Sequence, residues 1–349
     1  MRLSYVIITH NRRQRLMATL RYLIERTPTI EGGWEAWVVD NASTDGSADA
    51  AIKLGEPVRV VALPRNEGMP ARNHALARAR GEYIVLLDDD SYPLADAVTR
   101  SMAYLDGHPR TAAVTGRVLM NDGRPEAPDL PTVMIGCATC LRRSALDVVG
   151  HFDSRFFRQG EEYDLSFRLW QAGWAIERFG DLVYRHDISP SRRSTELVVR
   201  MNLRNHIILA ERYLPSDLRR EYRADWTQRY TAIGRQLGHH AAVRRALSQG
   251  RVRAWGEALR GRRVLSRTAI EAVFGLDRQA RAIARWATKY CLRRVLIADL
   301  SKNIYATWRG CMEAGLAVRA IADDHPAFAE LTYRGTPIIT NEAAFLDEP

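Results

Sequence analysis

The chain has few cysteines for its 349 residues. Its four cysteines are Cys137, Cys140, Cys291 and Cys311, and so few in a chain this long do not form a disulfide framework. Cys137 and Cys140 make a CxxC pair, but the other two cysteines give no second pair at matching spacing. A zinc or redox site is therefore not favoured.

Long hydrophobic runs and several recognisable motifs are also absent. No stretch is long enough to span a bilayer, and the N-terminus has no apolar core of signal-peptide length. We therefore expect a cytoplasmic protein. The fingerprints GxGxxG and GxxxxGK[ST] are missing from the N-terminal region, which argues against dehydrogenases and P-loop NTPases. Without zinc-finger spacing or an RNA-binding signature, no nucleic acid partner is expected.

Basic residues outnumber acidic residues in this chain. The chain has 51 Lys and Arg against 41 Asp and Glu, a formal net charge of +10. This balance suits phosphorylated substrates or an anionic membrane surface. Hydrophobic residues make up 46% of the chain, enough for a substantial core. The length predicts one large domain with a smaller unit.

The chain is organised around residues 81–92. Ile84 to Leu87 are all apolar, which predicts a short strand buried on both faces. Asp88, Asp89 and Asp90 follow directly and would lie at the carboxyl edge of a sheet, where open α/β folds bind ligands. Nothing local relieves their mutual repulsion, but a divalent cation such as Mg²⁺ or Mn²⁺ would. A solvated acidic turn is the alternative.

Strand and helix patterns alternate over the first ninety residues. Apolar runs predict strands at 3–9, 34–39 and 58–63, and helical spacing predicts helices at 14–25 and 70–80. This alternation predicts a parallel sheet with helices on both faces.

Together these stretches resemble the family 2 glycosyltransferases, and within that family they are most similar to the rhamnosyltransferase-like members. The matching segments occur in the family's order over about residues 1–210: 6–11, 38–47, 66–68 with 71–73, 81–92, 136–143, 149–153, 160–168 and 204–205. The resemblance implies the GT-A nucleotide-sugar-binding fold, a mostly parallel sheet flanked by helices.

The resemblance also implies a donor site. The residues that would bind the nucleotide sugar are Thr9, His10, Asn11, Asp40, Asn41, Arg72, Asp88 and Asp89. Two of these side chains have alternative roles. Asp40 could instead cap a helix, and Arg72 could lie on a solvated helix face or meet a phosphate or the base.

A metal site is implied at the same edge. By resemblance, Asp90 would bind Mn²⁺ or Mg²⁺ with support from Asp88, and His186 would complete the site or meet the diphosphate. Imidazole is a better ligand for Mn²⁺ than for Mg²⁺. A structural role for His186 is the alternative.

The catalytic base is expected within residues 161–164. The family usually has Glu-Asp at the first two positions, with the aspartate as base, whereas this chain has Glu161 and Glu162. Glu162 takes the place of the aspartate and can still act as a general base. Glu161 is the second candidate. Alternatively, both glutamates stabilise the start of a helix.

The remainder of the chain divides by composition. We expect a GT-A domain at 1–215, a helical, arginine-rich extension at 216–290 and a small Rossmann-like βαβ unit at 291–349. From 191 to 286 arginines occur in pairs, such as Arg192-Arg193, among Trp226, Trp255 and Trp286. This pattern favours a solvated helical face, and peripheral contact with an anionic membrane is the alternative. We expect the last unit to serve docking or homo-oligomerisation.

These observations predict a metal-dependent, inverting glycosyltransferase. It would move a sugar from a nucleoside-diphosphate sugar to a hydroxyl of a glycan, lipid-linked or small natural-product acceptor. Family habit favours UDP or dTDP over GDP. An acceptor loop is expected at 121–132, which is rich in proline. A non-catalytic nucleotide-sugar-binding relative and a sugar-phosphate nucleotidyltransferase are the alternatives.

Overall fold

A computed structural model describes residues 1–126, 130–187 and 195–346. Part of the expected acceptor loop, 127–129, and the pair Arg192-Arg193 lie outside the described residues. The chain forms two compact units, residues 1–193 and 194–349. The boundaries expected at 215 and 290 remain a prediction.

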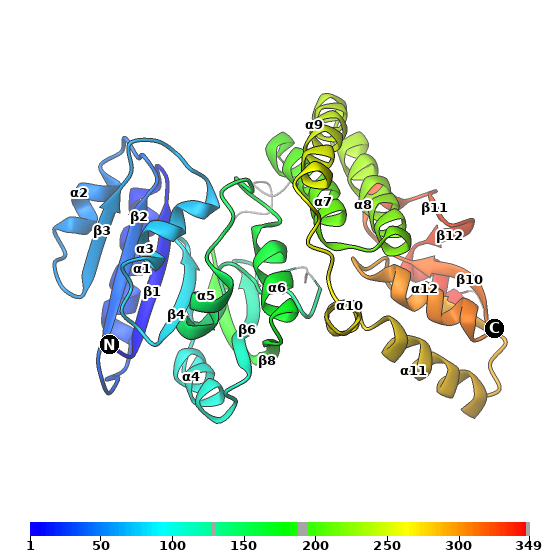
Figure 1. Cartoon of the computed structure of the whole chain (residues 1–349), viewed down its shortest axis with the longest axis horizontal. Helices are drawn as coiled ribbons and strands as arrows, with labels where there is room; N and C mark the ends of the chain where they lie inside the picture. The colour runs from blue at the N-terminus through cyan, green and yellow to red at the C-terminus, as the bar shows by residue number, and fades with distance from the viewer. Residues whose placement is uncertain (127–129, 188–194, 347–349) are drawn as a thin grey trace. The chain divides into compact units, whose positions relative to one another are not determined.

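The first unit contains an eight-stranded sheet, and Figure 1 labels most of its strands. Its strands, in spatial order, are β3 (Val58–Ala62), β2 (Trp34–Asp40), β1 (Leu3–Thr9), β4 (Tyr83–Asp88), β7 (Thr139–Arg142), β6 (Thr111–Met120), β8 (Ala175–His186) and β5 (Ser91–Pro93). The first four are mutually parallel, as expected. β7 runs antiparallel to both β4 and β6, which joins the parallel half to the second half of the sheet.

Helices cover both faces of this sheet. One core contains side chains of α1 (Arg13–Arg26), α2 (Ser47–Ile52) and α4 (Ala97–Gly107). The opposite core contains those of η1 (Met69–Arg72), α3 (Asn73–Leu76), α5 (Arg143–Val149) and α6 (Glu161–Gln171). Successive side chains of a strand point to opposite faces. β1 and β4 therefore supply both cores, which explains their mostly apolar sequences.

The helix expected at 70–80 is shorter than predicted. η1 and α3 together end at Leu76. One further turn, in which Ala79 N–H still donates to the Ala75 carbonyl, leads to two N–H groups that bind side chains outside the helix. Arg80 N–H donates to Glu35 Oε1 at 2.7 Å, and Gly81 N–H donates to Ser4 Oγ at 2.8 Å. A Cβ at Gly81 would lie 2.4 Å from Ser4 N. The chain must therefore turn here to enter β4.

Strand register brings three carboxyl ends to one level. Thr9 at the end of β1 pairs with Asp40 at the end of β2, and Ile8 pairs with Asp88 at the end of β4. Side chains from segments far apart in the sequence therefore meet at one edge of the sheet.

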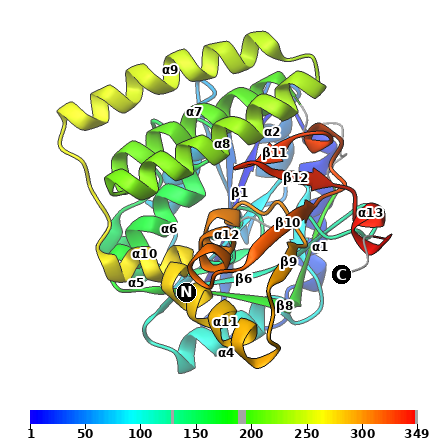
Figure 2. The same cartoon turned by 90° about the vertical axis from the view of Figure 1, so that its right-hand side faces the viewer.

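The second unit begins with long helices. They are α7 (Glu196–Tyr213), α8 (Ser216–Gln236), α9 (His240–Leu259), α10 (Arg267–Phe274) and α11 (Leu276–Lys289). Figure 2 shows α7, α8 and α9 side by side. Among the residues that the structure describes, no helix is long and apolar enough to cross a membrane.

A small sheet completes the second unit. Its order is β11 (Thr332–Tyr333), β12 (Thr336–Ile339), β10 (Ala317–Ala322) and β9 (Arg294–Ile297). β10 is parallel to both β9 and β12, and α12 (Ile304–Glu313) connects β9 to β10, which confirms the predicted βαβ pattern. β11, which the sequence did not predict, pairs antiparallel with β12. Ala232 of α8 lies in the same core as this sheet.

Candidate functional site

Of the three aspartates at the end of β4, Asp88 is partly buried and the other two are buried. Asp89 and Asp90 are each 2% exposed, so the alternative of a solvated acidic turn is wrong. Three arginines distant in the sequence supply positive charge: Arg12 contacts Asp89 and Asp90, Arg15 contacts Asp90, and Arg72 contacts Asp88.

Asp89 connects the end of β4 to the end of β1 through hydrogen bonds. Its Oδ2 accepts from Thr9 Oγ1 at 2.8 Å, and its Oδ1 accepts from Arg12 Nη1 at 2.5 Å. Burial outweighs the Arg12 charge and, with the neighbouring carboxylates, raises the pKa of Asp89 to about 7. The side chains of Thr9 and Asp89 are thus bonded to each other, and their predicted contact with a donor remains a prediction.

The pKa of Asp90 shifts in the opposite direction from that of Asp89. Burial acts to raise its pKa, but contact with His186 and the charge of Arg12 prevail and lower the pKa of Asp90 to about 2. Asp90 Oδ2 accepts from Arg12 Nη2 at 2.5 Å, whereas Asp90 Oδ1 lies 3.2 Å from His186 Nε2. Neither of the latter two atoms has a well-aligned hydrogen-bond partner among the described residues.

His186 lies between two groups of potential ligands. Its Nε2 faces Asp90 and also Asp88 Oδ2, which is 3.7 Å away. Its Nδ1 lies 3.2 Å from Glu126 Oε2 and 3.6 Å from Cys137 Sγ. Burial acts to lower the pKa of His186, but Cys137, Asp90 and Glu126 together raise it.

These residues fit a divalent cation. Ligand atoms of Asp88, Cys137 and His186 lie within 4.8 Å of one another, and Asp90 Oδ1 and His186 Nε2 are buried in the described part of the chain with no hydrogen bond. Carboxylate oxygens with an imidazole nitrogen suit Mn²⁺ better than Mg²⁺. Burial raises the pKa of Cys137 to about 11, so this thiol stays protonated at neutral pH. The metal-binding roles of Asp88, Asp90 and His186 remain predictions.

Arg72 is fully buried, so the alternative of a solvated helix face is wrong. Its Nη2 donates to Asp88 Oδ1 at 2.5 Å and to the Leu87 carbonyl at 3.2 Å. Its Nε and Nη1 have no hydrogen-bond partner within the described ranges. Arg72 therefore holds Asp88 in place and retains donors for a further acceptor.

Asp40 closes a turn. Its Oδ2 accepts from Ser43 N–H at 3.1 Å, while the N-cap of α2 is Gly46, so Asp40 does not cap that helix. Its Oδ1 is buried and accepts no hydrogen bond from a described residue. A buried carboxylate oxygen without a donor is costly, so this atom is available to an N–H or O–H group of a ligand.

Asn41 and its neighbours organise the loops around this edge. Asn41 Nδ2 donates to Asn66 Oδ1 and the Gly68 carbonyl, both at 3.0 Å. His10 Nδ1 lies 2.8 Å from the Asn41 carbonyl oxygen, and Asn11 Oδ1 accepts from Thr44 N–H at 2.7 Å. In the structure, the predicted donor-site residues His10, Asn11 and Asn41 thus form hydrogen bonds that hold neighbouring loops together. Their role toward a ligand remains a prediction.

The two candidate bases lie at the start of α6, whose N-cap is Gly160. Glu161 is 1% exposed, and burial together with the charge of Glu162 raises its pKa well above the usual range. Glu162 is less buried. A Cβ at Gly136 would lie 2.8 Å from Glu162 Oε1 and 3.6 Å from Arg72 Nη1. Arg72 thus lies near Glu162 as well as against Asp88.

Sequence reasoning missed four contributors to this site: Arg12, Arg15, Cys137 and Glu126. Arg12 could have been suspected, because it follows the β1 end directly in the sequence. Cys137 and Cys140 are both buried in the same core, and Cys137 Sγ also lies 3.6 Å from His186 Nδ1. The spacing of the CxxC pair gave no signal of this contact.

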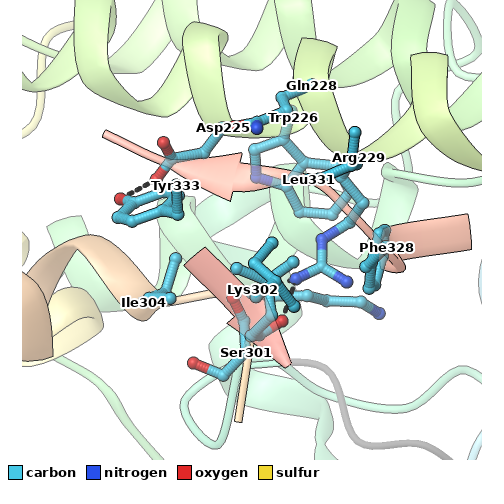
Figure 3. Close-up of a pocket in the computed structure, with 12 residues that line it drawn as sticks. Asp225, Trp226, Gln228, Arg229, Ser301, Lys302, Ile304, Phe328, Leu331 and Tyr333 are labelled. Atoms are coloured by element: carbon cyan, nitrogen blue, oxygen red, sulfur yellow. Dashed lines mark hydrogen bonds between the residues drawn. The ribbon is translucent and has the colours of Figure 1, made fainter. Parts of the chain in front are cut away.

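A small cavity lies at the carboxyl edge of the second sheet (Figure 3). Its volume is about 20 Å³, room for about one water molecule. Arg229 of α8 reaches across this edge and donates to the carbonyls of Leu300 and Ser301. Trp226 and Phe328 line the same cavity. A helix of the same unit thus occupies this edge.

Comparison with known proteins gives a consistent result. Residues 4–164 match the family model "Glycosyl transferase family 2". Over 155 residues the chain is 30% identical to the putative teichuronic acid biosynthesis glycosyltransferase TuaG of Bacillus subtilis, covering 40% of this chain and 60% of that protein. Over 113 residues it is 30% identical to the poly(ribitol-phosphate) beta-N-acetylglucosaminyltransferase TarS of Staphylococcus aureus, covering 31% of this chain and 19% of TarS. The chain thus spans less than two thirds of either relative.

Solved structures share the fold. Residues 1–349 of S. aureus TarS in complex with UDP-GlcNAc align over 97% of this chain and 98% of that chain, with a TM-score of 0.52 and 16% identity. GalNAc-T7 with UDP, GalNAc and Mn²⁺ aligns over 70% of this chain and 54% of that chain, with a TM-score of 0.53 and 19% identity. The expected GT-A fold class is confirmed.

Proposed function

We propose that the protein is a metal-dependent, inverting glycosyltransferase of family 2, whose family model matches residues 4–164. The observation that supports this proposal best is a set of buried atoms at one sheet edge. Asp40 Oδ1, Asp90 Oδ1 and His186 Nε2 lack hydrogen-bond partners among the described residues. Asp90 Oδ1 and His186 Nε2 face each other at 3.2 Å, and a ligand or metal ion would give all three atoms the partners that buried polar groups nearly always have.

The proposed donor is a UDP-sugar, and a dTDP-sugar is the second candidate. Asp40 Oδ1 would accept a hydrogen bond from the base or ribose, together with the Thr9 to Asn11 edge. Support for uridine comes from the TarS structures, one of which is a complex with UDP-GlcNAc. A mannosyltransferase of the same fold is in complex with GDP-Man and Mn²⁺, so the nucleotide must be tested directly.

The proposed metal ligands are Asp90, Asp88 and His186, with Cys137 adjacent. A bound divalent cation would neutralise charge on the diphosphate leaving group. Arg12 and Arg72 hold Asp90 and Asp88 in position. The preference for Mn²⁺ over Mg²⁺ follows from the imidazole nitrogen in this set.

Glu162 is the proposed general base. It would accept the proton of the acceptor hydroxyl while that oxygen attacks the anomeric carbon and the bond to the diphosphate oxygen breaks. Inversion follows, because attack and departure take place on opposite faces of the sugar. Glu161 is a weaker candidate, because it is 1% exposed and because burial and the charge of Glu162 raise its pKa.

The proposed acceptor is a hydroxyl of an anionic glycan or polyol polymer, which is lipid-linked when it is presented at a membrane surface. The names of the relatives TuaG and TarS refer to teichuronic acid and poly(ribitol-phosphate). The formal net charge of +10 favours encounter with such a polyanion. Neutral glycans and small natural products are the acceptors to test against it.

Thermal shift with a nucleotide panel tests the donor and metal proposals together. UDP, dTDP, GDP and CMP are measured with and without Mn²⁺ on the wild type, on Asp90→Asn and on the control Asp299→Asn in the second unit. A ligand specific to the folded state raises the melting temperature. We expect a UDP shift that needs Mn²⁺, is lost in Asp90→Asn and persists in the control. No shift with any nucleotide and metal would refute the proposal.

Two further assays separate the alternatives. A non-catalytic relative would bind UDP-sugar without releasing UDP, even slowly to water. A nucleotidyltransferase would release pyrophosphate from a nucleoside triphosphate and a sugar 1-phosphate. The proposed transferase releases UDP only from UDP-sugar, faster with acceptor, and chelation of the metal stops the release.

A further inference from the structure

Helix α9 exposes a line of large apolar side chains. Val252, Trp255 and Leu259 are each 67% exposed. They are separated by three and four residues along the helix, so they lie on one side of it. Three such residues on one exposed face form a small apolar patch rather than scattered single residues.

The fold of the second unit does not need this patch. The opposite side of α9, with Ala242, Val243, Ala246 and Gly250, is buried and packs against α7. A Cβ at Gly250, for example, would lie 2.9 Å from Ile207 Cδ1. α9 therefore has one side committed to the unit's core and one apolar side that covers nothing in it.

Positive charge flanks the patch. Arg244 and Arg251 are seven residues apart, and Arg251 is four residues before Trp255, so the two guanidinium groups line the same side of α9. Both are exposed, and no described side chain forms an ion pair with either. The one acidic residue in residues 240–267 is Glu257, which is buried and bonded to Arg212 at 2.8 Å.

The other tryptophans of the helical region differ from Trp255. Trp226 is buried and stacks on His206 with ring centroids 3.2 Å apart. Trp286 on α11 is 66% exposed, but the apolar face of α11 is used against α12, where Ile283 meets Gly310. Among the described helices, α9 has the most exposed large apolar side chains, namely three.

We propose that this face of α9 (the α9 face: Arg244, Arg251, Val252, Trp255 and Leu259) binds the surface of an anionic lipid bilayer. The apolar residues enter the interface between headgroups and acyl chains, where tryptophan is favoured, and the arginines meet lipid phosphates. A basic helix with an apolar face and no exposed acid matches this partner. A protein partner of ordinary surface would not require the charge bias.

Vesicle flotation of the intact protein tests the proposal. The vesicles contain phosphatidylcholine alone or equal parts phosphatidylcholine and phosphatidylglycerol. We expect binding to the anionic vesicles only, with a steep loss as salt is raised. Fluorescence of Trp255, identified as the signal lost in Trp255→Ser, should shift to shorter wavelength on binding.

Variants locate the surface. Arg244→Gln with Arg251→Gln should weaken partitioning by about fivefold per arginine, and Trp255→Ser by about tenfold. Trp286→Ser, and Arg281→Gln with Arg285→Gln, change the same residue types on exposed positions of α11 and should leave binding unchanged. All changed side chains are exposed, and circular dichroism checks that each variant is folded.

Each other outcome overturns the proposal. No binding to anionic vesicles excludes a lipid partner, and binding lost only in the α11 variants moves the surface elsewhere. If Trp255→Ser abolishes a concentration-dependent dimer and no vesicle binding occurs, the face binds a second copy. The flotation readout needs neither donor nor acceptor, so it succeeds or fails independently of the proposed transferase activity.

Discussion

In the first unit, β1, β2 and β4 end in Thr9, Asp40 and Asp88 at one edge of the sheet. In the second unit, β9 and β10 are also parallel, and Asp299 and Asp323 follow their carboxyl ends. The first edge retains buried atoms without hydrogen-bond partners in the described chain. At the second edge, Arg229 of α8 donates to two backbone carbonyls. The cavity beside Arg229 has room for about one water molecule.

This difference shows that a strand ending in an aspartate does not by itself make a site. The same topology places polar groups at both edges, but the element packed over the edge decides whether they face a ligand. In the first unit arginines hold the carboxylates in place without covering all of them. In the second unit a helix supplies the missing partners, so we interpret that edge as a packing surface.

The largest expected effect is that of Glu162→Gln. A glutamine cannot accept the acceptor's proton, so kcat should fall by about a thousandfold while the affinity for UDP stays the same. Turnover and calorimetric UDP binding measure the two quantities. Glu161→Gln should cost less than about tenfold, because Glu161 is buried and is not the proposed base.

Asp299→Asn is the matched control at the second edge and should leave turnover unchanged. If Glu161→Gln abolishes turnover and Glu162→Gln does not, the base assignment is reversed. If Asp299→Asn lowers turnover, the two edges are not functionally distinct.

Arg72→Gln should reduce both stability and donor binding. It removes the buried partner of Asp88 and of the Leu87 carbonyl, which we expect to cost about 3 kcal/mol of unfolding free energy. Chemical denaturation and the UDP thermal shift measure the two effects. Loss of stability with undiminished UDP binding would show that Arg72 has only a structural role.

Arg229→Gln should reduce stability alone. The loss of its bonds to Leu300 and Ser301 should cost about 2 kcal/mol, with the UDP shift and turnover unchanged. Arg267→Gln is the control, because that side chain is 92% exposed and should change stability by less than about 0.5 kcal/mol. A change in UDP affinity in Arg229→Gln would contradict a purely packing role for the second edge.

The smallest effect is a difference in pH dependence. At the second edge, burial outweighs Arg334 and raises the pKa of Asp225 to about 6. The native state therefore holds this proton more tightly, and the resulting stability is present below the ordinary pKa of 3.8 and is lost as pH rises through about 6. At the first edge, the pKa of Asp89 is also raised, to about 7. The pKa of Asp90 is instead lowered to about 2, so Asp90 contributes stability above 3.8 that is lost as pH falls toward 2.

Calorimetric melting of the wild type and of Asp225→Asn, between about pH 4 and pH 7, measures this difference. The variant should lose less stability than the wild type over that interval. Equal slopes in the two proteins would mean that Asp225 titrates normally.

Much of the first unit was predictable from the sequence. β1, β2 and β4 were predicted within a residue or two, because strands buried on both faces have mostly apolar sequences. The position of Asp88 to Asp90 at the sheet edge followed from the same pattern. The region around β7 was not predictable, because its antiparallel pairing with β4 and β6 depends on contacts between distant segments.

The site shows the same division. The sequence by itself determined which carboxylates end β2 and β4, the Glu-Glu start of α6 and the basic, tryptophan-containing helices, because these are properties of local runs of residues. Only the tertiary structure decided that Arg12 and Arg72 hold the aspartates, that Cys137 lies beside His186, and that Trp226 is buried while Trp255 is exposed. These contacts join segments tens of residues apart, and packing and burial set their energies rather than local sequence pattern.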